Sequence, residues 1–392
     1  MKTTKLKLSP DQQQVLDKTL EWIDAPVGQY LTIGGYAGTG KTTLTAYIRQ
    51  EIFKKAPLLS VAFCSYTGKA ARNLTEKLKE NNGTISGDSV STIHSLIYTA
   101  ITNKEGNVTG WRRKEFLDAE LIIVDEASMV DPFILNDLLS YEVPIIAVGD
   151  HGQLPPIGAS YSLMQDPHLT LTEIHRQKED SPIIDVSIMA RTDGEIPIKK
   201  FSPNVVKISR NDPDSRETLN EALESFSEET LIICGYNATR LRLNKELRAR
   251  KDRYGDVPEA GDRVVALKNN HYSGIHNGAV GTITKILEED KTGNWLLVKI
   301  DIDGQDKPYQ GYIYKSQFNQ KETISGNLKD PDGHQGDLFD FGYALTVHKA
   351  QGSQAETVIL FEERFPKSSD EEWRRWLYTA VTRARKNLLI IG

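Results

Sequence analysis

The sequence contains no long apolar run. Within its 392 residues, no segment approaches the roughly 20 consecutive apolar residues of a membrane-spanning helix. Residues 1–6 also lack the apolar core of a signal peptide. We therefore expect no membrane partner and a location in the cytoplasm, which would be the host cytoplasm if the source is viral.

The sequence also has few cysteines and no net positive charge. The two cysteines, Cys64 and Cys234, fall in predicted buried strands, which favours reduced thiols in the core over a disulfide. None of the eight histidines pairs with a cysteine at zinc-finger spacing, so we expect no structural zinc. The net charge of −6 gives no overall sign of nucleic-acid binding. An acidic protein can still carry a locally basic groove.

Short apolar segments alternate with helical patterns along most of the chain. Their lack of polar alternation is typical of parallel strands covered on both faces. The length and the recurrence of this pattern predict two doubly wound α/β domains, at residues 1–176 and 177–392. The predicted strands are 30–33, 60–64, 121–124 and 144–148 in the first domain and 231–234, 357–361 and 388–391 in the second, and helices are predicted at 68–80 and 131–140.

Two stretches interrupt the alternation. Residues 96–113 alternate around a turn at 103–106, which predicts a β-hairpin inserted in the first domain. Residues 257–336 are rich in glycine and aspartate, and their spacing predicts a small antiparallel barrel inserted in the second. Its short strands are expected at 263–267, 281–287, 296–302 and 312–314.

A glycine-rich segment joins the first predicted strand to a predicted helix. It reads Gly35-Tyr36-Ala37-Gly38-Thr39-Gly40-Lys41-Thr42. Strand, glycine loop and helix form the context of a phosphate-binding P-loop, whose N–H groups and helix N-terminus bind anions. Lys41 would contact the β- and γ-phosphates, and Thr42 would bind Mg²⁺. The candidate nucleotide contacts are Gly35, Ala37, Gly38, Thr39, Gly40, Lys41, Thr42 and Thr43.

Polar residues follow two further predicted strands. Asp125 and Glu126 end the strand at 121–124, so Asp125 could hold Mg²⁺ while Glu126 polarises the attacking water. Gln153, in the segment 149–156, could bond the γ-phosphate or that water. Strand ends at one edge of such a sheet converge on a ligand. Taken alone, the first segment is equally typical of an ordinary strand-end turn, and the second is more typical of an ordinary turn than of a site.

Taken in order, these and further segments resemble the motifs of superfamily 1 helicases, in the RecD/Dda-like branch that moves 5′ to 3′. The resemblance covers nearly the whole chain, and its strength lies in the complete ordered series rather than in any one motif. The matching segments are 8–12, 35–42, 66–71, 91–95, 125–128, 149–156, 171–176, 345–353 and 378–385.

The resemblance assigns roles to single residues. Gln12 would face the adenine, Gly352 would contact the nucleotide, Arg176 would reach the γ-phosphate, and Arg383 would serve as arginine finger. Together with Lys41, Glu126 and Gln153, the two arginines complete the expected catalytic set. The expected nucleic-acid contacts are Thr67, Lys69, Thr92, His94, Thr346, His348 and Gln351.

The same resemblance implies two RecA-like domains, a hairpin that splits the duplex and an SH3-like barrel. Trp111 of the hairpin is either the wedge or a core anchor. His175 departs from the family pattern, because many relatives carry an aromatic residue there. Since the P-loop and Arg383 fall in different predicted domains, ATP hydrolysis would open and close the cleft between them.

The resulting expectation is a monomeric, ATP- and Mg²⁺-dependent DNA helicase. Its expected partners are single-stranded DNA, single-strand/duplex junctions, and replication or recombination proteins. Two alternatives stay open: a translocase or RNA-directed helicase, and a nucleotide-switched interaction protein. A basic helix predicted after residues 231–234 is either a solvated face or part of a strand groove. Its cations are Arg240, Arg242, Lys245, Arg248, Arg250, Lys251 and Arg253.

Overall fold

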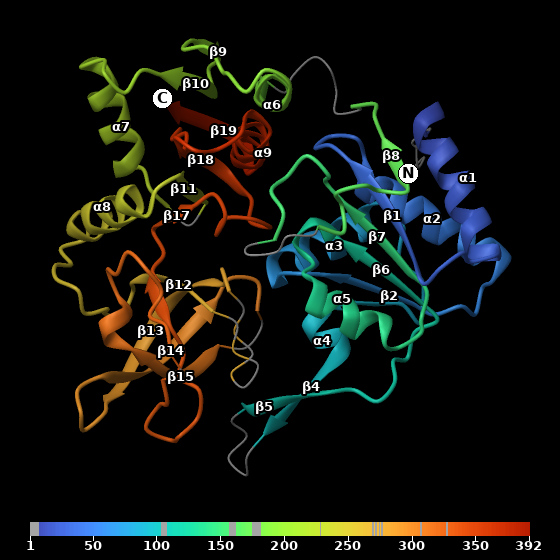
Figure 1. The fold of residues 1–392 in the computed structure, drawn as a ribbon, viewed down its shortest axis with the longest axis horizontal. Helices are drawn as coiled ribbons and strands as arrows, with labels where there is room; N and C mark the ends of the chain where they lie inside the picture. The colour runs from blue at the N-terminus through green and yellow to red at the C-terminus, as the bar shows by residue number, and fades with distance from the viewer. Residues whose placement is uncertain are drawn as a thin grey trace. The chain divides into compact units, whose positions relative to one another are not determined.

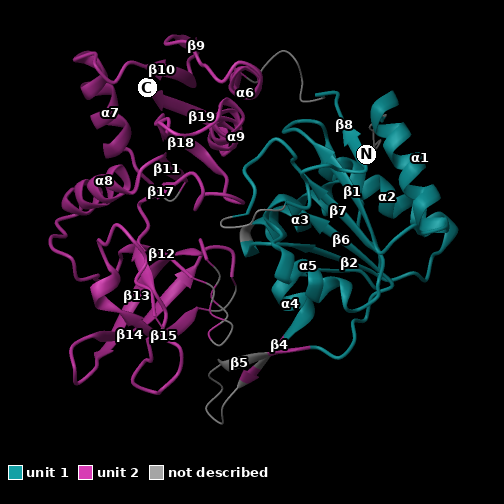
Figure 2. Ribbon diagram, in the orientation of Figure 1, with its two compact units in different colours: residues 1–98, 114–181 teal, residues 99–113, 182–392 magenta. Residues whose placement is uncertain are grey.

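The structure is a computed structural model of the chain (Figure 1). It describes residues 8–102, 108–156, 162–174, 182–227, 229–268, 270, 273, 275, 277–305, 308–326 and 328–392. The chain divides into two compact units, coloured separately in Figure 2. Unit 1 comprises residues 1–98 and 114–181, and unit 2 comprises residues 99–113 and 182–392.

Unit 1 is built on a six-stranded parallel sheet in the order β3-β2-β6-β7-β1-β8. The four strands predicted from the sequence are all present, which confirms the doubly wound parallel sheet of this unit. The strands are β1 (Tyr30–Gly35), β2 (Val61–Ser65), β3 (Ser89–Thr92), β6 (Leu121–Asp125), β7 (Ile145–Gly149) and β8 (Leu169–Leu171).

Helices cover both faces of this sheet (Figure 1). Alternate strand residues enter different cores: Val61 and Phe63 pack in one cluster, whereas Ala62 and Cys64 pack in the other. Because both faces are buried, the strands need no polar alternation. The first core is completed by α1 (Pro10–Asp24), α2 (Lys41–Lys55) and α3 (Gly68–Glu80), and the second by α4 (Ile93–Ile97) and α5 (Pro132–Leu139).

The helix boundaries follow from local capping. Ser9 and Gln12 form a reciprocal capping box at the start of α1. Thr67 caps α3, and Asp131 caps α5 ahead of Pro132. The helices predicted at 68–80 and 131–140 are thereby confirmed, the second trimmed to the residues between its caps.

A short two-stranded insertion follows α4. The strands β4 (Tyr98–Thr102) and β5 (Val108–Arg113) form a two-stranded sheet. The expected start of this hairpin at residue 96 is wrong, because Leu96 and Ile97 are adjacent buried residues of the helix α4. The predicted turn at 103–106 lies outside the described residues, as does the side chain of Trp111 in β5.

Unit 2 contains a second six-stranded sheet, in the order β17-β11-β18-β19-β10-β9. The edge strand β9 (Lys200–Ser202) is antiparallel, and the other pairs are parallel. The parallel strands are β10 (Val205–Ile208), β11 (Thr230–Cys234), β17 (Ala344–Thr346), β18 (Ala355–Phe361) and β19 (Ala384–Ile391). Helices α6 (Pro182–Thr192) and α9 (Asp370–Val381) pack together, and α7 (Asp214–Glu224) and α8 (Asn237–Ala249) contribute to the core that faces the inserted sheet.

The insertion in unit 2 is a five-stranded antiparallel sheet in the order β15-β14-β13-β12-β16. A bridge between Ile313 and Asp337 brings the segment before β16 against β15, so the sheet curls toward closure. Its strands are β12 (Arg263–Ala266), β13 (Val280–Glu289), β14 (Trp295–Ile302), β15 (Tyr309–Tyr314) and β16 (Phe339–Phe341). The last strand lies beyond the expected insertion end at residue 336.

The basic helix α8 is neither simply solvated nor a strand groove. Arg240, Asn244 and Arg248 lie at intervals of four residues on one helical face, and all are buried. Arg240 pairs with Asp340 at 2.6 Å, and Arg248 pairs with Asp262 at 3.0 Å. These charges therefore fix the inserted sheet to α8, and the two sequence-based interpretations are wrong for them. Arg242, by contrast, is exposed and pairs with Glu246 on the same helix.

Both cysteines are free and buried, as predicted. Burial raises the pKa of the Cys64 thiol above its usual range and that of Cys234 to about 12. Both thiols are therefore protonated at neutral pH and behave as core residues. Among the described residues, no helix is both long and apolar enough to cross a membrane.

Candidate active site and strand-contacting segments

The P-loop has the backbone of an anion cradle. Gly38 and Gly40 have φ angles of 87° and 78°, in the left-handed region that favours glycine. Gly40 is the N-cap of α2, and no side chain caps the helix. The N-terminus of α2 therefore keeps its N–H groups and positive dipole end available for a phosphate.

Lys41 lies over this loop. Its Nζ donates to the carbonyl oxygens of Gly35 at 2.7 Å and Tyr36 at 3.0 Å. These are neutral acceptors, so a phosphate oxygen would be a stronger partner for the ammonium. Thr42 is half-buried in the first turn of α2, where a hydroxyl can serve as an Mg²⁺ ligand.

The Gln12 side chain is hydrogen-bonded to the P-loop. Its Oε1 accepts from the Ser9 N–H at 3.2 Å, and its Nε2 donates to the Thr39 carbonyl at 3.0 Å. A Cβ at Gly40 would lie 2.4 Å from Gln12 Nε2, and the left-handed φ of 78° favours glycine at that position. Gln12 therefore supports the loop, and its contact with a base stays a prediction.

Asp125 and Glu126 lie at the carboxyl edge of the same sheet. Desolvation raises the pKa of Asp125 to about 6, the Glu126 carboxylate adds to the increase, and Lys77 and Lys41 act against it. Since β6 and β1 are both parallel neighbours of β7, the P-loop and these carboxylates follow strands that end at the same edge of the sheet. Glu126 has φ 55°, an unusual left-handed conformation for a non-glycine residue. Strained conformations of this kind cluster at active sites.

Gln153 is buried on the loop that follows β7. Asp150 Oδ2 accepts from Gln153 Nε2 at 3.3 Å, and Asp150 Oδ1 accepts from the Gly152 N–H at 3.0 Å. The ring of His151 lies 4.3 Å from that of Tyr36, which links this loop to the P-loop. The structure thus brings the Gln153 loop, the P-loop and the β6 carboxylates to one edge of unit 1.

The segment that leads toward Arg176 is held by α1. Asp11 Oδ2 accepts from the backbone N–H groups of Thr172 at 2.7 Å and Glu173 at 3.0 Å. Arg176 and His175 themselves lie outside the described residues. Their expected roles stay predictions.

The residues of unit 1 that are expected to contact a nucleic-acid strand include two helix caps. Thr67 Oγ1 accepts from the Ala70 N–H at 3.2 Å, and Thr92 Oγ1 accepts from the Ser95 N–H at 3.1 Å. Since β2 and β3 are parallel neighbours, both threonines lie at the carboxyl edge of the sheet. His94 is buried, with its ring 4.5 Å from that of Tyr98. The side chain of Lys69, in α3, lies outside the described part of the chain.

The candidate contacts of unit 2 lie in a tight turn after β17. Thr346 Oγ1 accepts from the Lys349 N–H at 3.4 Å, Gln351 is buried, and Gly352 has φ 71°. Burial lowers the pKa of His348, which favours the neutral form of its imidazole. A neutral imidazole can donate one hydrogen bond to a phosphate or sugar oxygen.

Arg383 is held within unit 2 at the end of α9. Its Nε donates to the Thr379 carbonyl at 2.9 Å, its Nη1 to the Ser353 carbonyl at 3.3 Å and its Nη2 to Thr382 Oγ1 at 3.2 Å. It is 1% exposed. The guanidinium therefore joins α9 to the turn that ends at Ser353.

Comparison with known proteins finds a family match in each of the two units. The AAA domain family matches residues 23–159, and the UvrD-like helicase C-terminal domain family matches residues 341–391. The ATP-dependent RecD2 DNA helicase of Deinococcus radiodurans is 28% identical over 98% of this chain and 49% of its own length. The ATP-dependent DNA helicase dda of Enterobacteria phage T4 is 33% identical over 41% of this chain and 38% of its own.

These matches support a superfamily 1 helicase of the RecD/Dda-like branch. A Bacteroides Pif1 structure bound to single-stranded DNA has the same fold, with a TM-score of 0.52, 19% identity, and coverage of 98% of this chain and 92% of that one. The RecA-like architecture is thereby established. The chain spans about half the length of its RecD2 relative.

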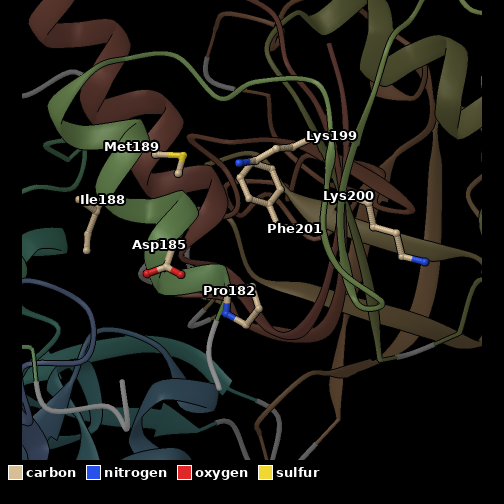
Figure 3. A pocket seen from close by; sticks show the side chains of 7 residues that line it. All are labelled: Pro182, Asp185, Ile188, Met189, Lys199, Lys200 and Phe201. Atoms are coloured by element: carbon tan, nitrogen blue, oxygen red, sulfur yellow. The ribbon is translucent and has the colours of Figure 1, made fainter. Parts of the chain in front are cut away.

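A surface pocket of this RecD/Dda-like chain lies apart from the residues just described. It has a volume of about 460 Å³ and lies in unit 2 between α6 and β9 (Figure 3). Lys199 Nζ lies 4.7 Å from the Phe201 ring centroid at its rim. Its lining contains none of the predicted site residues.

Sequence reasoning missed several residues that organise this helicase-like site. Asp11, Tyr36 and His151 lie inside recognised segments, but their sequence positions carry no signal of the contacts they make. Lys349 was also missed as a contact between the turn after β17 and the inserted sheet. In each case the partner is distant in sequence, so a folded structure is needed to find it.

Proposed function

We propose that the chain is an ATP-dependent DNA helicase that translocates 5′ to 3′ on single-stranded DNA and unwinds duplexes. The observation that carries the proposal is the uncapped P-loop helix of unit 1, with Lys41, Asp125 and Glu126 at one sheet edge. The RecD2 and dda relatives, both described as ATP-dependent DNA helicases, support this function.

The residues of unit 1 fit ATP and Mg²⁺. The glycine loop and the N-terminus of α2 suit the phosphates, and Lys41 supplies a charge that can leave its neutral carbonyl partners. Thr42 and Asp125 would hold Mg²⁺, which neutralises phosphate charge when bound. Glu126 would accept a proton from the attacking water, and Gln153 would orient that water. Arg176 and Arg383 would stabilise the negative charge that develops in the transition state.

The strand contacts are proposed for both units. Thr67, Thr92 and neighbouring groups would grip the strand on unit 1, and Thr346, His348 and Gln351 would do so on unit 2. Hydroxyl, imidazole and amide groups contact phosphate and sugar without reading sequence. Two grips that alternate with the nucleotide state convert hydrolysis into movement along the strand. A monomeric state, a cytoplasmic location and recombination or replication partners stay predictions.

The test is strand displacement from two matched duplexes, one with a 5′ tail and one with a 3′ tail. We expect ATP-dependent displacement from the 5′-tailed substrate, and preference for the 3′ tail would overturn the polarity. Glu126→Gln is the matched control, because it keeps the side-chain size and removes the proton acceptor. It should still bind ATP but not turn it over.

ATP hydrolysis with and without polynucleotide separates the alternatives. Stimulation by single-stranded DNA supports the proposal, and stronger stimulation by RNA would favour an RNA-directed motor. Hydrolysis indifferent to both would indicate a nucleotide-switched interaction protein. Salt must be held constant, because phosphate contacts make affinity steeply salt-dependent.

A further inference from the structure

Lys349 lies in the middle of the turn proposed to contact the strand, but its ammonium faces the inserted sheet. Its Nζ donates to the Leu267 carbonyl at 3.2 Å and to Asn277 Oδ1. The backbone of Gly278 approaches the same residue, since a Cβ there would lie 3.3 Å from the Lys349 carbonyl oxygen. Two of the three donors of this ammonium are therefore directed to one loop.

That loop connects β12 to β13, and its base is closed by backbone bonds. The Gly278 N–H donates to the Ala266 carbonyl at 2.9 Å, and the Ala266 N–H donates to the Ala279 carbonyl at 2.8 Å. Within the loop, Asn270 pairs with Ile275, which is buried in the core of unit 2. Asn277 is therefore presented from a loop with its own backbone pairing.

Asp337 fixes the loop to the rest of the inserted sheet. This buried carboxylate accepts from Asn270 Nδ2 at 2.8 Å and Ser273 Oγ at 2.9 Å, both in the loop. It also accepts from the Tyr309 hydroxyl of β15 at 2.8 Å. Buried and part-buried hydrogen bonds thus tie the sheet to the loop at Asn270 and Ser273, and the loop to Lys349 at Leu267 and Asn277.

We propose that Asn277 and Lys349 form a latch that positions the strand-contacting turn Thr346–Ser353 against the inserted sheet. Lys349 is then a positioning residue rather than a phosphate contact, and the sheet supports strand binding through it. This inference rests on the proposed function, because it assigns Thr346, His348 and Gln351 to the strand. Burial, which lowers the pKa of Lys349 to about 8, agrees with an ammonium facing protein rather than solvent.

The latch and a direct phosphate contact make different predictions about salt. A lysine that neutralises a phosphate releases counterions, so its loss should reduce the slope of log affinity against log salt by roughly 0.7 for a single strand. A lysine that positions other groups leaves this slope unchanged while affinity falls at every salt concentration. The slope therefore reports which role Lys349 plays.

The experiment measures binding of a labelled oligo-dT strand to the full chain over a salt series. We expect Asn277→Ala and Lys349→Met each to weaken binding about tenfold, the scale of one charge-assisted hydrogen bond. The double variant should bind no worse than either single variant, with an unchanged salt slope. Asn277→Asp should retain affinity, because a carboxylate also accepts from the ammonium. Lys268→Met is the matched control, since that lysine of the same loop bonds the Ile324 carbonyl instead.

Two results would overturn the latch: multiplicative losses in the double variant, or a slope reduced in Lys349→Met alone. A double-mutant cycle on the free energy of unfolding judges the contact without DNA, and additive effects there would also reject it. Failure of the wild-type chain to bind any single strand would instead reject the proposed function. In that case the unfolding cycle still decides whether Asn277 and Lys349 are coupled.

Discussion

The turns that lead from a parallel strand into a helix differ between the two units. In unit 1, β1 leads through the glycine loop to α2, whose N-terminus no side chain caps. In unit 2, β11 leads to α8, and the Glu363 carboxylate binds the turn that precedes this helix. It accepts from the N–H groups of Gly235 at 2.9 Å and Tyr236 at 3.0 Å, and from Thr239 Oγ1 at 2.6 Å.

The difference teaches how one fold unit can bind an external anion or use an internal one. Helix N-termini favour negative charge wherever it comes from. A Cβ at Gly235 would lie 2.8 Å from the Glu363 carbonyl oxygen, so the turn in unit 2 is packed closed. Unit 1 keeps the position open with glycines. We therefore expect unit 2 to contribute to hydrolysis through Arg383 rather than through an anion cradle.

The largest effect should follow the loss of that arginine. Arg383→Ala should reduce DNA-stimulated ATP turnover by roughly 10³–10⁵-fold, because the transition-state charge loses its cation. Steady-state hydrolysis at saturating ATP measures this, with circular dichroism as the check of folding. Arg385→Ala is the control, since Arg385 is exposed and bonds Gln354. Equal rates for both variants would leave unit 2 without its assigned catalytic contribution.

The open helix end of unit 1 should be the next most sensitive feature. Lys41→Ala should lower turnover by roughly 10²–10³-fold or more, the usual cost of removing one preorganised charge from such a site. The matched control is Lys54→Ala at the other end of α2, where the lysine pairs with Glu51 at the surface. Hydrolysis by Lys41→Ala at the wild-type rate would contradict the phosphate-binding role of the loop.

The closed helix end of unit 2 should respond in stability instead. Glu363→Ala removes the acceptor of two backbone N–H groups and one hydroxyl, which should cost about 2–4 kcal/mol of the free energy of unfolding. Denaturant titration measures the loss, and Glu371→Ala is a control on an exposed carboxylate of α9. Unchanged stability in Glu363→Ala would show that this carboxylate does not stabilise the start of α8. The proposed parallel with a phosphate bound at the start of α2 would then fail.

Asp337 is a buried carboxyl in the inserted sheet, and it can be compared with the two helix starts by the pH dependence of stability. Burial raises the pKa of this carboxyl from 3.8 to about 6, against the effect of its hydrogen bonds from Tyr309, Asn270 and Ser273. Between these values the folded state binds more protons than the unfolded state. The contribution to stability is therefore greatest at low pH and is lost as the pH rises through about 6.

The matched measurement compares wild type with Asp337→Asn, which cannot ionise. Relative to that variant, the wild-type chain should gain about 1.4 kcal/mol of stability when the pH falls from 7 to 5. Asp301→Asn, on the exposed side of β14, controls for general effects of charge. A stability difference that does not change with pH would contradict the raised pKa.

The longer buried strands and the starts of α3 and α5 were predictable because their causes are local. Thr67 and Asp131 cap helices whose apolar spacing begins directly after them, and these strands read as continuous apolar runs. The start of the hairpin was misplaced because apolar residues such as Leu96 and Ile97 fit both a buried strand and a buried helix. Burial of both neighbours favoured the helix, and that information comes from the packing of α4 against the sheet.

The sequence alone predicted where a phosphate would bind, because three glycines and a lysine lie within eight consecutive residues between a predicted strand and a predicted helix. The tertiary structure alone decided what the other charges do. Arg240 meets Asp340 across 100 residues of chain, and Glu363 meets Gly235 across 128. A charge acts according to its partner and its exposure to water. Folding sets both, since it brings distant residues together and removes the solvent between them.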